Sequence, residues 1–396
     1  MFDARKRMDP YYAGLTSAGD SFQFQMKLDR PLAEMNWADP FRPDDTVPEH
    51  VKKATIDCIN SMAAHYTFPI GDRELRCEVA KRVKRVNGLD VDPDKNITIC
   101  SGSDTAFVFT MRPFLVPGAG DEVMIPTPTY ANDYDIAPLC GAKTVLVPTY
   151  AEDGYQLRVE EFEKRLTPHT KIVLITNPNN PTSTVYSRGA LEKLADFVKK
   201  NDLLLVVDQC FEDTVFDGVE MVNIAAMPGM AERTVLISSL SKGMGLCGYR
   251  VGYIVASDDI TDVYHTYAVE LLGAPNTAAQ AGILAALKDP AFMEDYRQEY
   301  MARAKVLADI LDQIPHIQFQ RPQSCFYFWI DVSYYGTAAE VMRYLAENAA
   351  VLVSPGGAFG SDQCIRLIYA AMRDRQDCID AVCRIRDALL AHPNNH

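Results

Sequence analysis

Long apolar runs are missing from the sequence. No stretch approaches the ~18 consecutive apolar residues that a transmembrane helix requires. The segment from Met1 to Arg7 contains basic residues but no apolar stretch of the kind found in a signal peptide. We therefore expect a cytoplasmic protein with no membrane partner.

Basic charge is in short supply. The 396 residues include 39 Lys and Arg against 53 Asp and Glu, which gives a net charge of -14 at pH 7. A negative surface repels both the phosphate backbone of nucleic acids and anionic lipid. We expect no nucleic-acid partner.

The spacings of metal ligands and of disulfide frameworks are also missing. The ten cysteines contain no C-x-x-C pair, none has a histidine at metal-binding distance, and the seven histidines form no cluster. Most cysteines lie in apolar stretches, where a reduced thiol packs as a small core residue. The sequence therefore predicts neither a metal site nor disulfides.

What is present is an ordinary globular composition with a clear pattern. Hydrophobic residues make up 48% of the chain, and its length indicates two or three domains. Residues 46–275 alternate short apolar strands with amphipathic segments such as 71–87 and 188–201, which is typical of an α/β fold. We predict a large domain with a mostly parallel seven-stranded sheet sandwiched by helices, its strands at 97–100, 122–126, 143–147, 171–176, 203–208, 234–239 and 251–256.

The pattern changes after residue 275. Charged helical segments at 277–313, 337–348 and 373–391 mix with strand-like segments at 317–332 and 350–354. We predict a smaller α+β domain over 276–396. Residues 1–45 have too little periodicity to form a domain alone, so we expect an N-terminal arm that joins the small domain or a partner chain.

A glycine-rich segment raises the possibility of a dinucleotide site, because residues 243–248 match G-x-G-x-x-G. That motif requires a helix to begin within the glycines, yet an apolar strand follows at 251–255. We therefore disfavour a dehydrogenase. The segment does place Lys242 at the end of a buried strand, where a lysine can form a Schiff base.

The segment from Ser239 to Tyr253, SLSKGMGLCGYRVGY, resembles the cofactor-lysine motif of the fold-type I aminotransferases that depend on pyridoxal 5'-phosphate (PLP), the class I/II family. Other features of this family recur in the same order over residues 30–390. The resemblance implies the PLP-dependent transferase fold, PLP as cofactor, and Lys242 as both Schiff-base residue and general base.

The resemblance also assigns the two ends of the cofactor. The phosphate would be held by a turn before a helix and by residues around the lysine, namely Gly102, Ser103, Asp104, Ser239, Ser241 and Arg250. Asp208 would pair with the ring nitrogen and complete, with Lys242 and Tyr130, the catalytic set. Tyr130 would stack on the ring, and Asn180 would donate to its 3-hydroxyl.

The substrate residues follow from the same resemblance. Arg366 would clamp the substrate carboxylate with its planar guanidinium, while Asn180, Ala38 and Trp37 would lie near the substrate. Tyr66 matches a tyrosine that reaches the cofactor phosphate of the neighbouring subunit, so we expect a homodimer whose active sites each use two chains.

Three positions depart from the family pattern. Phe211 stands where a tyrosine usually donates to the cofactor oxygen, while Ala38 and Ser183 replace glycines. These changes leave the reaction open. We expect an aminotransferase acting on an α-amino acid and a 2-oxo acid, the alternatives being a PLP-dependent lyase or decarboxylase and a non-catalytic PLP-binding regulator. The sequence does not indicate which amino acid is used.

Overall fold

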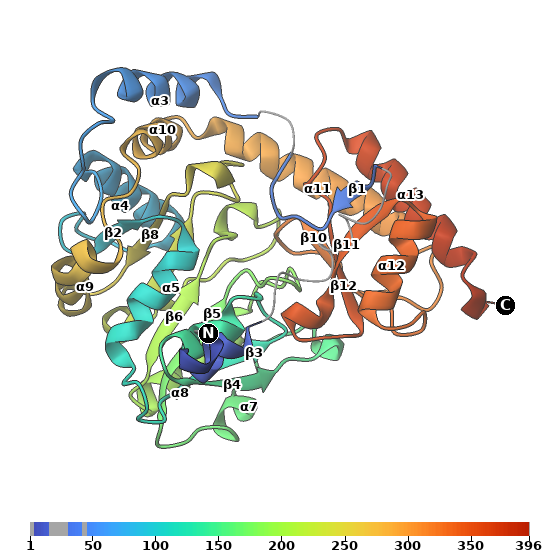
Figure 1. Ribbon diagram of the computed structural model, residues 1–396, viewed down its shortest axis with the longest axis horizontal. Helices are drawn as coiled ribbons and strands as arrows, with labels where there is room; N and C mark the ends of the chain where they lie inside the picture. Colours follow the sequence, from blue (N-terminus) through green and yellow to red (C-terminus); the bar gives the residue numbers. More distant parts are fainter. Residues whose placement is uncertain (1–3, 16–30, 42–45, 396) are drawn as a thin grey trace.

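Two sheets organise the chain, and the computed structural model describes residues 4–15, 31–41 and 46–395. A seven-stranded sheet has the order β2-β8-β7-β6-β5-β3-β4, and a five-stranded sheet has the order β1-β11-β12-β10-β9 (Figure 1). The predicted α/β fold is confirmed.

The larger sheet is mostly parallel. Only β8 runs against its neighbours, pairing antiparallel with β2 and β7. Each predicted strand is present with its ends shifted by no more than one residue: β2 (Ile97–Cys100), β3 (Glu122–Thr127), β4 (Lys143–Pro148), β5 (Thr170–Thr176), β6 (Leu204–Asp208), β7 (Thr234–Ser239) and β8 (Gly252–Val255).

Helices bury both faces of this sheet, which is why its strands read as continuous apolar runs. Along β5 the side chains alternate between two core clusters, with Ile172 and Leu174 in one and Val173 and Ile175 in the other. One cluster draws on α4 (Arg73–Asn87), α8 (Arg188–Lys200) and α10 (Thr277–Lys288); the opposite one draws on α5 (Ser103–Met111), α6 (Asp133–Leu139) and α9 (Asp258–Leu271).

Local sequence signals set the ends of the crossover helices. Helix α4 begins where the Asp72 carboxylate accepts a hydrogen bond of 3.0 Å from the backbone of Leu75, and it ends at Gly88 in the left-handed conformation. Helix α8 begins in the same way at Ser187.

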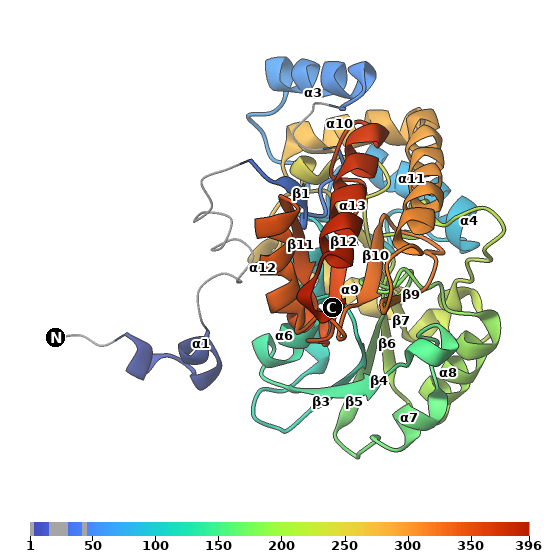
Figure 2. The same ribbon diagram turned by 90° about the vertical axis from the view of Figure 1, so that its right-hand side faces the viewer.

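The smaller sheet gathers the C-terminal strands and one N-terminal strand. Strand β1 pairs in parallel with β11, so the chain before the large sheet contributes to the smaller one (Figure 2). The proposed domain boundaries at 45/46 and 275/276 stay a prediction. The elements around this sheet are β1 (Ala33–Met35), β9 (Gln318–Phe319), β10 (Tyr327–Asp331), β11 (Val351–Pro355), β12 (Cys364–Ile368), α11 (Ala291–Leu311), α12 (Ala338–Asn348) and α13 (Arg375–Leu390).

Shorter elements complete the described chain. The remaining α-helices are α1 (Pro10–Gly14), α3 (Glu49–Ser61) and α7 (Val159–Glu163). Single 3-10 turns lie at Arg5–Arg7, Arg112–Phe114, Ala151–Asp153, Glu212–Thr214, Ile224–Ala226, Ala231–Arg233, Cys247–Tyr249, Gly356–Phe359 and Pro393–Asn395.

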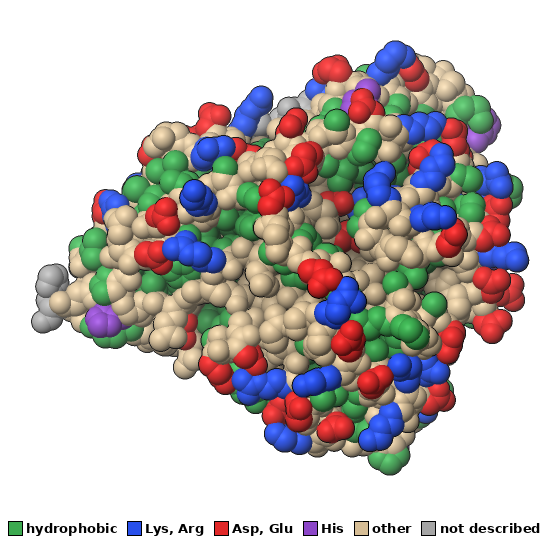
Figure 3. Space-filling view, turned by 180° about the vertical axis from the view of Figure 1, so that it is seen from behind, with side chains coloured by type: hydrophobic (Ala, Val, Ile, Leu, Met, Phe, Trp, Pro, Cys, Tyr) green, Lys and Arg blue, Asp and Glu red, His purple; other side chains and the backbone are tan. Residues whose placement is uncertain are grey.

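The surface carries charges of both signs. Acidic and basic side chains are interspersed over the face opposite to the first view (Figure 3). Within the described ranges, no helix combines the length and apolarity needed to cross a bilayer.

Candidate active site

The predicted site residues gather where strands of the large sheet end. Lys242 follows β7, Asp208 ends β6, Asn180 follows β5 and Tyr130 follows β3, and these four strands run parallel. The carboxyl ends of parallel strands meet at one edge of a sheet, where α/β proteins place their ligands. The strand order therefore brings the predicted residues together.

Lys242 has neutral partners in this structure. Its Nζ donates a hydrogen bond of 2.7 Å to the carbonyl oxygen of Ala38 and lies 3.8 Å from Sγ of Cys247. No carboxylate in the described part of the chain forms an ion pair with Lys242. Ala38 belongs to the segment after β1, so the small sheet's N-terminal strand delivers a backbone acceptor to the lysine. A lysine with no carboxylate bonded directly to its amine is suited to covalent chemistry.

Asp208 is buried at the end of β6. Its Oδ1 accepts a hydrogen bond of 2.9 Å from the backbone N–H of Cys210. Burial raises the pKa of Asp208 to about 6, while the Cys210 hydrogen bond and the charge of Lys242 oppose that rise. The carboxylate is therefore ionised at neutral pH and can pair with a cationic ring nitrogen.

The predicted phosphate end combines a helix start, two hydroxyls and a cation. Helix α5 begins after Gly102 with no side-chain cap, which leaves backbone N–H groups for an anion. Gly102 has a φ of 82°, and a Cβ there would clash with the guanidinium of Arg250. Ser239 donates a hydrogen bond of 2.8 Å to the Ser241 hydroxyl. A glycine turn with positive φ, with backbone and hydroxyl donors and a cation around it, fits the phosphate of PLP.

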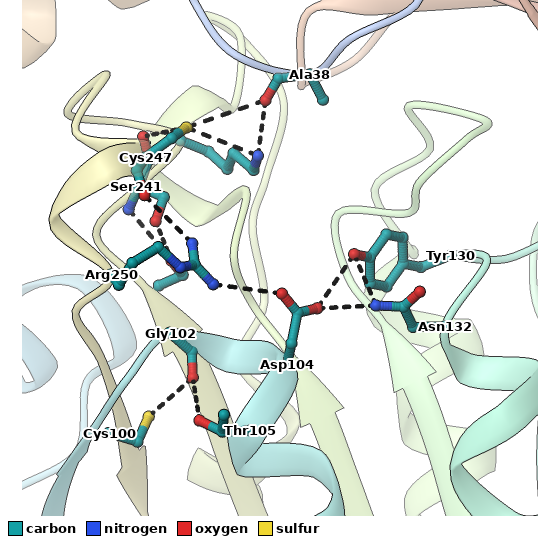
Figure 4. Close-up of polar contacts among 12 residues, drawn as sticks. Ala38, Cys100, Gly102, Asp104, Thr105, Tyr130, Asn132, Ser241, Cys247 and Arg250 are labelled. Atoms are coloured by element: carbon teal, nitrogen blue, oxygen red, sulfur yellow. Dashed lines mark hydrogen bonds and ion pairs between the residues drawn. The ribbon is translucent and has the colours of Figure 1, made fainter. Parts of the chain in front are cut away.

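Asp104 links this end to the predicted ring-stacking residue. Its carboxylate lies 3.4 Å from Nη2 of Arg250 and accepts hydrogen bonds from Tyr130 (3.1 Å) and Asn132 (3.0 Å) (Figure 4). Burial raises the pKa of the Tyr130 hydroxyl, and the Asp104 charge raises it further. Tyr130 therefore stays neutral, and its hydroxyl is fixed by hydrogen bonds to Asp104 and from Asn132.

Arg366, on β12 of the smaller sheet, completes the site from the other side. The side chain is buried at 7% exposure, and its Nη1 donates a hydrogen bond of 2.9 Å to Oδ1 of Asn180. Its Nε has no partner among the described residues, and its guanidinium lies 4.2 Å from the ring centroid of Phe359. Burial lowers the pKa of Arg366 to about 10, so the group stays cationic. A buried cation with a free donor is suited to an entering carboxylate.

Two predicted residues lie on the surface. Trp37 is 59% exposed and Tyr66 is 94% exposed. The single chain therefore does not bring either of them into the buried cluster, and their assignments stay predictions. Tyr66 follows α3 at the edge of the molecule, a position compatible with contact to a second chain.

The three residues that depart from the family pattern have different surroundings in the structure. Phe211 is buried, and its ring packs edge-on at 5.4 Å from Phe326 and 5.5 Å from Tyr327. Ser183 has a φ of 59°, in the left-handed region that favours glycine, and its hydroxyl donates a hydrogen bond of 2.8 Å to the Tyr327 carbonyl. Ala38 uses its carbonyl to bind Lys242, a role that its side chain does not affect.

Two residues next to the site were not predicted from the sequence. Cys247 lies in the lysine motif itself, and Asp133 is a buried carboxylate three residues after Tyr130. Asp133 stands in the polar run from Asn132 to Asp135, which is also typical of an exposed helix start, so the sequence carries no local signal for its burial. Among the described residues, no group of three His, Cys, Asp or Glu side chains is placed to hold a metal ion.

Both the sequence and the structure resemble those of known proteins. The family model described as aminotransferase class I and II matches residues 35–385. Relatives 32% identical over 339 residues include the aromatic-amino-acid aminotransferase 2 of Thermococcus litoralis and the aspartate aminotransferase of Pyrococcus abyssi, each match covering 84% of this chain and 86% of the relative. Similar solved structures include the aromatic aminotransferase from Pyrococcus horikoshii OT3 (29% identity, TM-score 0.86, 94% of this chain and 99% of that one) and the aspartate aminotransferase from Thermus thermophilus with maleate (26% identity, TM-score 0.87, 96% and 99%).

Proposed function

The chain belongs to the class I and II aminotransferase family, and from this premise we propose the roles of its individual residues. It is a PLP-dependent enzyme that moves an amino group between an amino acid and a 2-oxo acid. When bound, the cofactor accepts the electron pair released at the substrate Cα. We assign the protein's own contributions as follows.

Lys242 holds the cofactor covalently and moves the substrate proton. The 2.7 Å hydrogen bond from its Nζ to the Ala38 carbonyl supports this role, because it gives the amine a fixed place without a neutralising carboxylate. Asp208 keeps the ring nitrogen cationic. Gly102, Ser103, Asp104, Ser239, Ser241 and Arg250 hold the phosphate, with the backbone rather than the carboxylate of Asp104 facing it.

Arg366 is the residue proposed to bind the substrate carboxylate. It is a buried cation that has only a neutral acceptor, the Asn180 side chain, and a free Nε donor. A substrate carboxylate would supply the missing negative charge. Asn180 keeps its Nδ2 for the cofactor's 3-hydroxyl while its Oδ1 orients Arg366.

We infer further that the preferred side chain is apolar or aromatic. The other buried arginines of the described chain are committed elsewhere: Arg76 to Asp94, Arg82 to Glu212 and Asp213, and Arg303 to Glu299. None of them is available for a second substrate carboxylate. Rings of Phe359 and Tyr327 flank Arg366. The relatives named above include enzymes named for aromatic amino acids and for aspartate, so both classes belong in the test.

A homodimer is the third part of the proposal. Exposed apolar side chains follow one stretch from α3 onward, namely Ile56, Ile59, Met62, Tyr66 and Phe68. Ile56 and Ile59 lie three residues apart on α3, and Met62 follows at its C-terminal cap, so the three form one apolar stripe. A second copy of the chain would cover this stripe and place Tyr66 at the neighbouring site.

Ten unpaired cysteines support the expected cytoplasmic location, where thiols stay reduced.

The deciding experiment traps the cofactor and identifies the products. Borohydride reduction of the purified protein followed by peptide mapping should place the cofactor on Lys242. Lys242→Ala should carry no adduct and turn over no substrate, whereas Lys193→Ala, at an exposed lysine of α8, should behave as wild type. An adduct on another lysine would contradict the assignment.

A panel of amino donors and 2-oxo acceptors then tests the expectation that kcat/KM is higher for phenylalanine or tyrosine than for aspartate.

A further inference from the structure

A second buried carboxylate lies beside Asp208 and has no role in the proposal so far. Asp133 is the first residue of α6, three residues after Tyr130, and only 2% of it is exposed. No ion pair within the described ranges involves it. A buried acidic group without a cation needs a physical explanation.

The hydrogen bonds of Asp133 satisfy only one of its two oxygens. Its Oδ2 accepts hydrogen bonds of 2.7 Å from the Thr129 hydroxyl and 3.1 Å from the Thr176 hydroxyl. Its Oδ1 is buried and has no partner among the described residues. An ionised carboxylate in that position would bury charge on an oxygen without a donor, which costs more than burying the neutral acid.

Thr176 connects Asp133 to Asp208. In the parallel pair of β5 and β6, Thr176 stands directly opposite Asp208, so the two side chains emerge on the same face of the sheet. Asp133 binds Thr176 and therefore approaches the carboxylate of Asp208 from α6.

Two neighbouring carboxylates, Asp208 and Asp104, disfavour a negative charge on Asp133. Burial and the charges of Asp208 and Asp104 together raise the pKa of Asp133 to about 7, although the hydrogen bonds from Thr129 and Thr176 lower it. The charge of Asp133 in turn raises the pKa of the Tyr186 and Tyr134 hydroxyls, which burial raises as well, so both stay neutral. Asp208, in contrast, has a backbone donor and the charge of Lys242 to keep it ionised.

We propose that Asp133 is a positioning residue, a buried carboxylic acid that holds a proton beside Asp208 and leaves Asp208 as the ionised member of the pair. The two carboxyl groups then have different tasks because their surroundings differ. Asp208 presents one negative charge to the cofactor ring. Asp133 fixes the hydroxyls of Thr129 and Thr176 around it without adding a second charge. The benefit to the cofactor rests on the proposed role of Asp208, but the protonation of Asp133 does not.

The first test is the pH dependence of thermal stability in the PLP-saturated protein. The native state holds the Asp133 proton up to about pH 7, whereas an unfolded chain releases it near pH 4. The native state therefore loses stability relative to the unfolded state between these pH values, and the loss is complete above them. Asp133→Asn has the same shape, keeps an acceptor for both threonines and cannot ionise. The Tm of Asp133→Asn minus that of wild type should rise from pH 4 to pH 7 and then level off.

A matched control is the exposed carboxylate of the same helix, since Asp135→Asn should give a Tm difference without this step. If the Tm difference for Asp133→Asn is independent of pH, or falls as pH rises, Asp133 is an ionised structural residue and the inference is overturned. Because this readout needs no turnover, it separates the inference from the proposed function. The same Tm difference can be measured on the cofactor-free protein.

The second test detects the proton directly. Infrared spectra of the protein labelled with ¹³C-aspartate should show at pH 6 a protonated carboxyl band that is lost in Asp133→Asn and kept in both Asp135→Asn and Asp208→Asn. Absence of the band in wild type would overturn the inference. PLP affinity should stay within about threefold of wild type in Asp133→Asn, whereas a loss of tenfold or more would show that the cofactor needs a charge at Asp133.

Discussion

Nη1 of Arg366 donates a 2.9 Å hydrogen bond to Oδ1 of Asn180, which joins the five-stranded sheet to the segment after β5 of the seven-stranded sheet. The bond orients a buried cation without neutralising it, because an amide oxygen carries no charge. The site is therefore assembled from both sheets, and its affinity for an anion depends on their relative position.

Replacing Arg366 by lysine should separate charge from geometry. Lysine keeps the positive charge but lacks the planar fork that meets both oxygens of a carboxylate. We expect kcat/KM to fall by at least about 30-fold, since removing one partner of a buried charged hydrogen-bond pair costs about 2–5 kcal/mol. Steady-state kinetics with the preferred amino donor measure this loss.

The control for this variant is Arg188→Lys on α8, an exposed arginine paired with Glu220. It should leave kcat/KM unchanged. PLP content should also stay normal in Arg366→Lys, because Arg366 touches the cofactor only through Asn180. Full activity of Arg366→Lys would mean that another group binds the substrate carboxylate.

Strand periodicity and motif order predicted the large sheet because their signals are local. All seven strands were found, since parallel strands buried on both faces need continuous apolar runs such as 203–208. Strand β1 could not be found in this way. Its three residues, Ala33–Met35, become a strand through pairing with β11, more than 300 residues later in the chain. Tertiary contacts of this kind leave no local pattern.

The site residues divide in the same way, into those with a local sequence signal and those whose place depends on tertiary contacts. Lys242, Asp208 and Arg366 were predicted because each occupies a motif position, and they lie where two sheets meet. Asp133 was missed, since its partners Thr129 and Thr176 become neighbours only after α6 packs on the sheet. The surface positions of Trp37 and Tyr66 could not be predicted either, because exposure depends on what the rest of the chain covers.

The affinity of the protein for PLP should depend on the ionisation of Asp208. The folded pKa of this carboxyl is about 6 without the cofactor, so lowering the pH through 6 adds a proton and removes the partner of the ring nitrogen. Asp208→Asn is neutral at every pH. The ratio of PLP affinities, wild type to Asp208→Asn, should be near one at pH 4 and rise through pH 6 to a plateau.

Taking the ratio cancels the titration of free PLP, because both proteins bind the same cofactor. Equilibrium titration of PLP into cofactor-free protein, followed by absorbance, gives both affinities. A ratio that does not change with pH would remove Asp208 from the proposed pairing.

Ser183 should tolerate glycine better than alanine. Its left-handed backbone, with a φ of 59°, costs a non-glycine residue about 1–2 kcal/mol, and its hydroxyl satisfies the buried Tyr327 carbonyl. Ser183→Ala keeps the strain and loses the hydrogen bond, so it should destabilise the protein by about 1–3 kcal/mol. Ser183→Gly loses the bond but also the strain, and its net change should be the smaller of the two. Denaturant unfolding of both variants measures the order, and the reverse order would contradict this account.

Tyr66 tests whether each active site needs two chains. Because its side chain is 94% exposed and follows the apolar stripe of α3, we expect it to reach the phosphate end of a neighbouring subunit. Tyr66→Phe should bind PLP more weakly, and Lys242→Ala should be inactive. When the two variants are mixed and allowed to exchange subunits, one site of each hybrid carries both defects and the other carries neither. Hybrids should therefore recover full function at one site, measured as PLP-dependent turnover at a PLP concentration that leaves Tyr66→Phe mostly empty.

Mixing Lys193→Ala with Lys242→Ala gives the reference for one intact site per hybrid. A monomer in sedimentation equilibrium, or hybrids verified by mass that perform no better than Tyr66→Phe alone, would exclude a shared site.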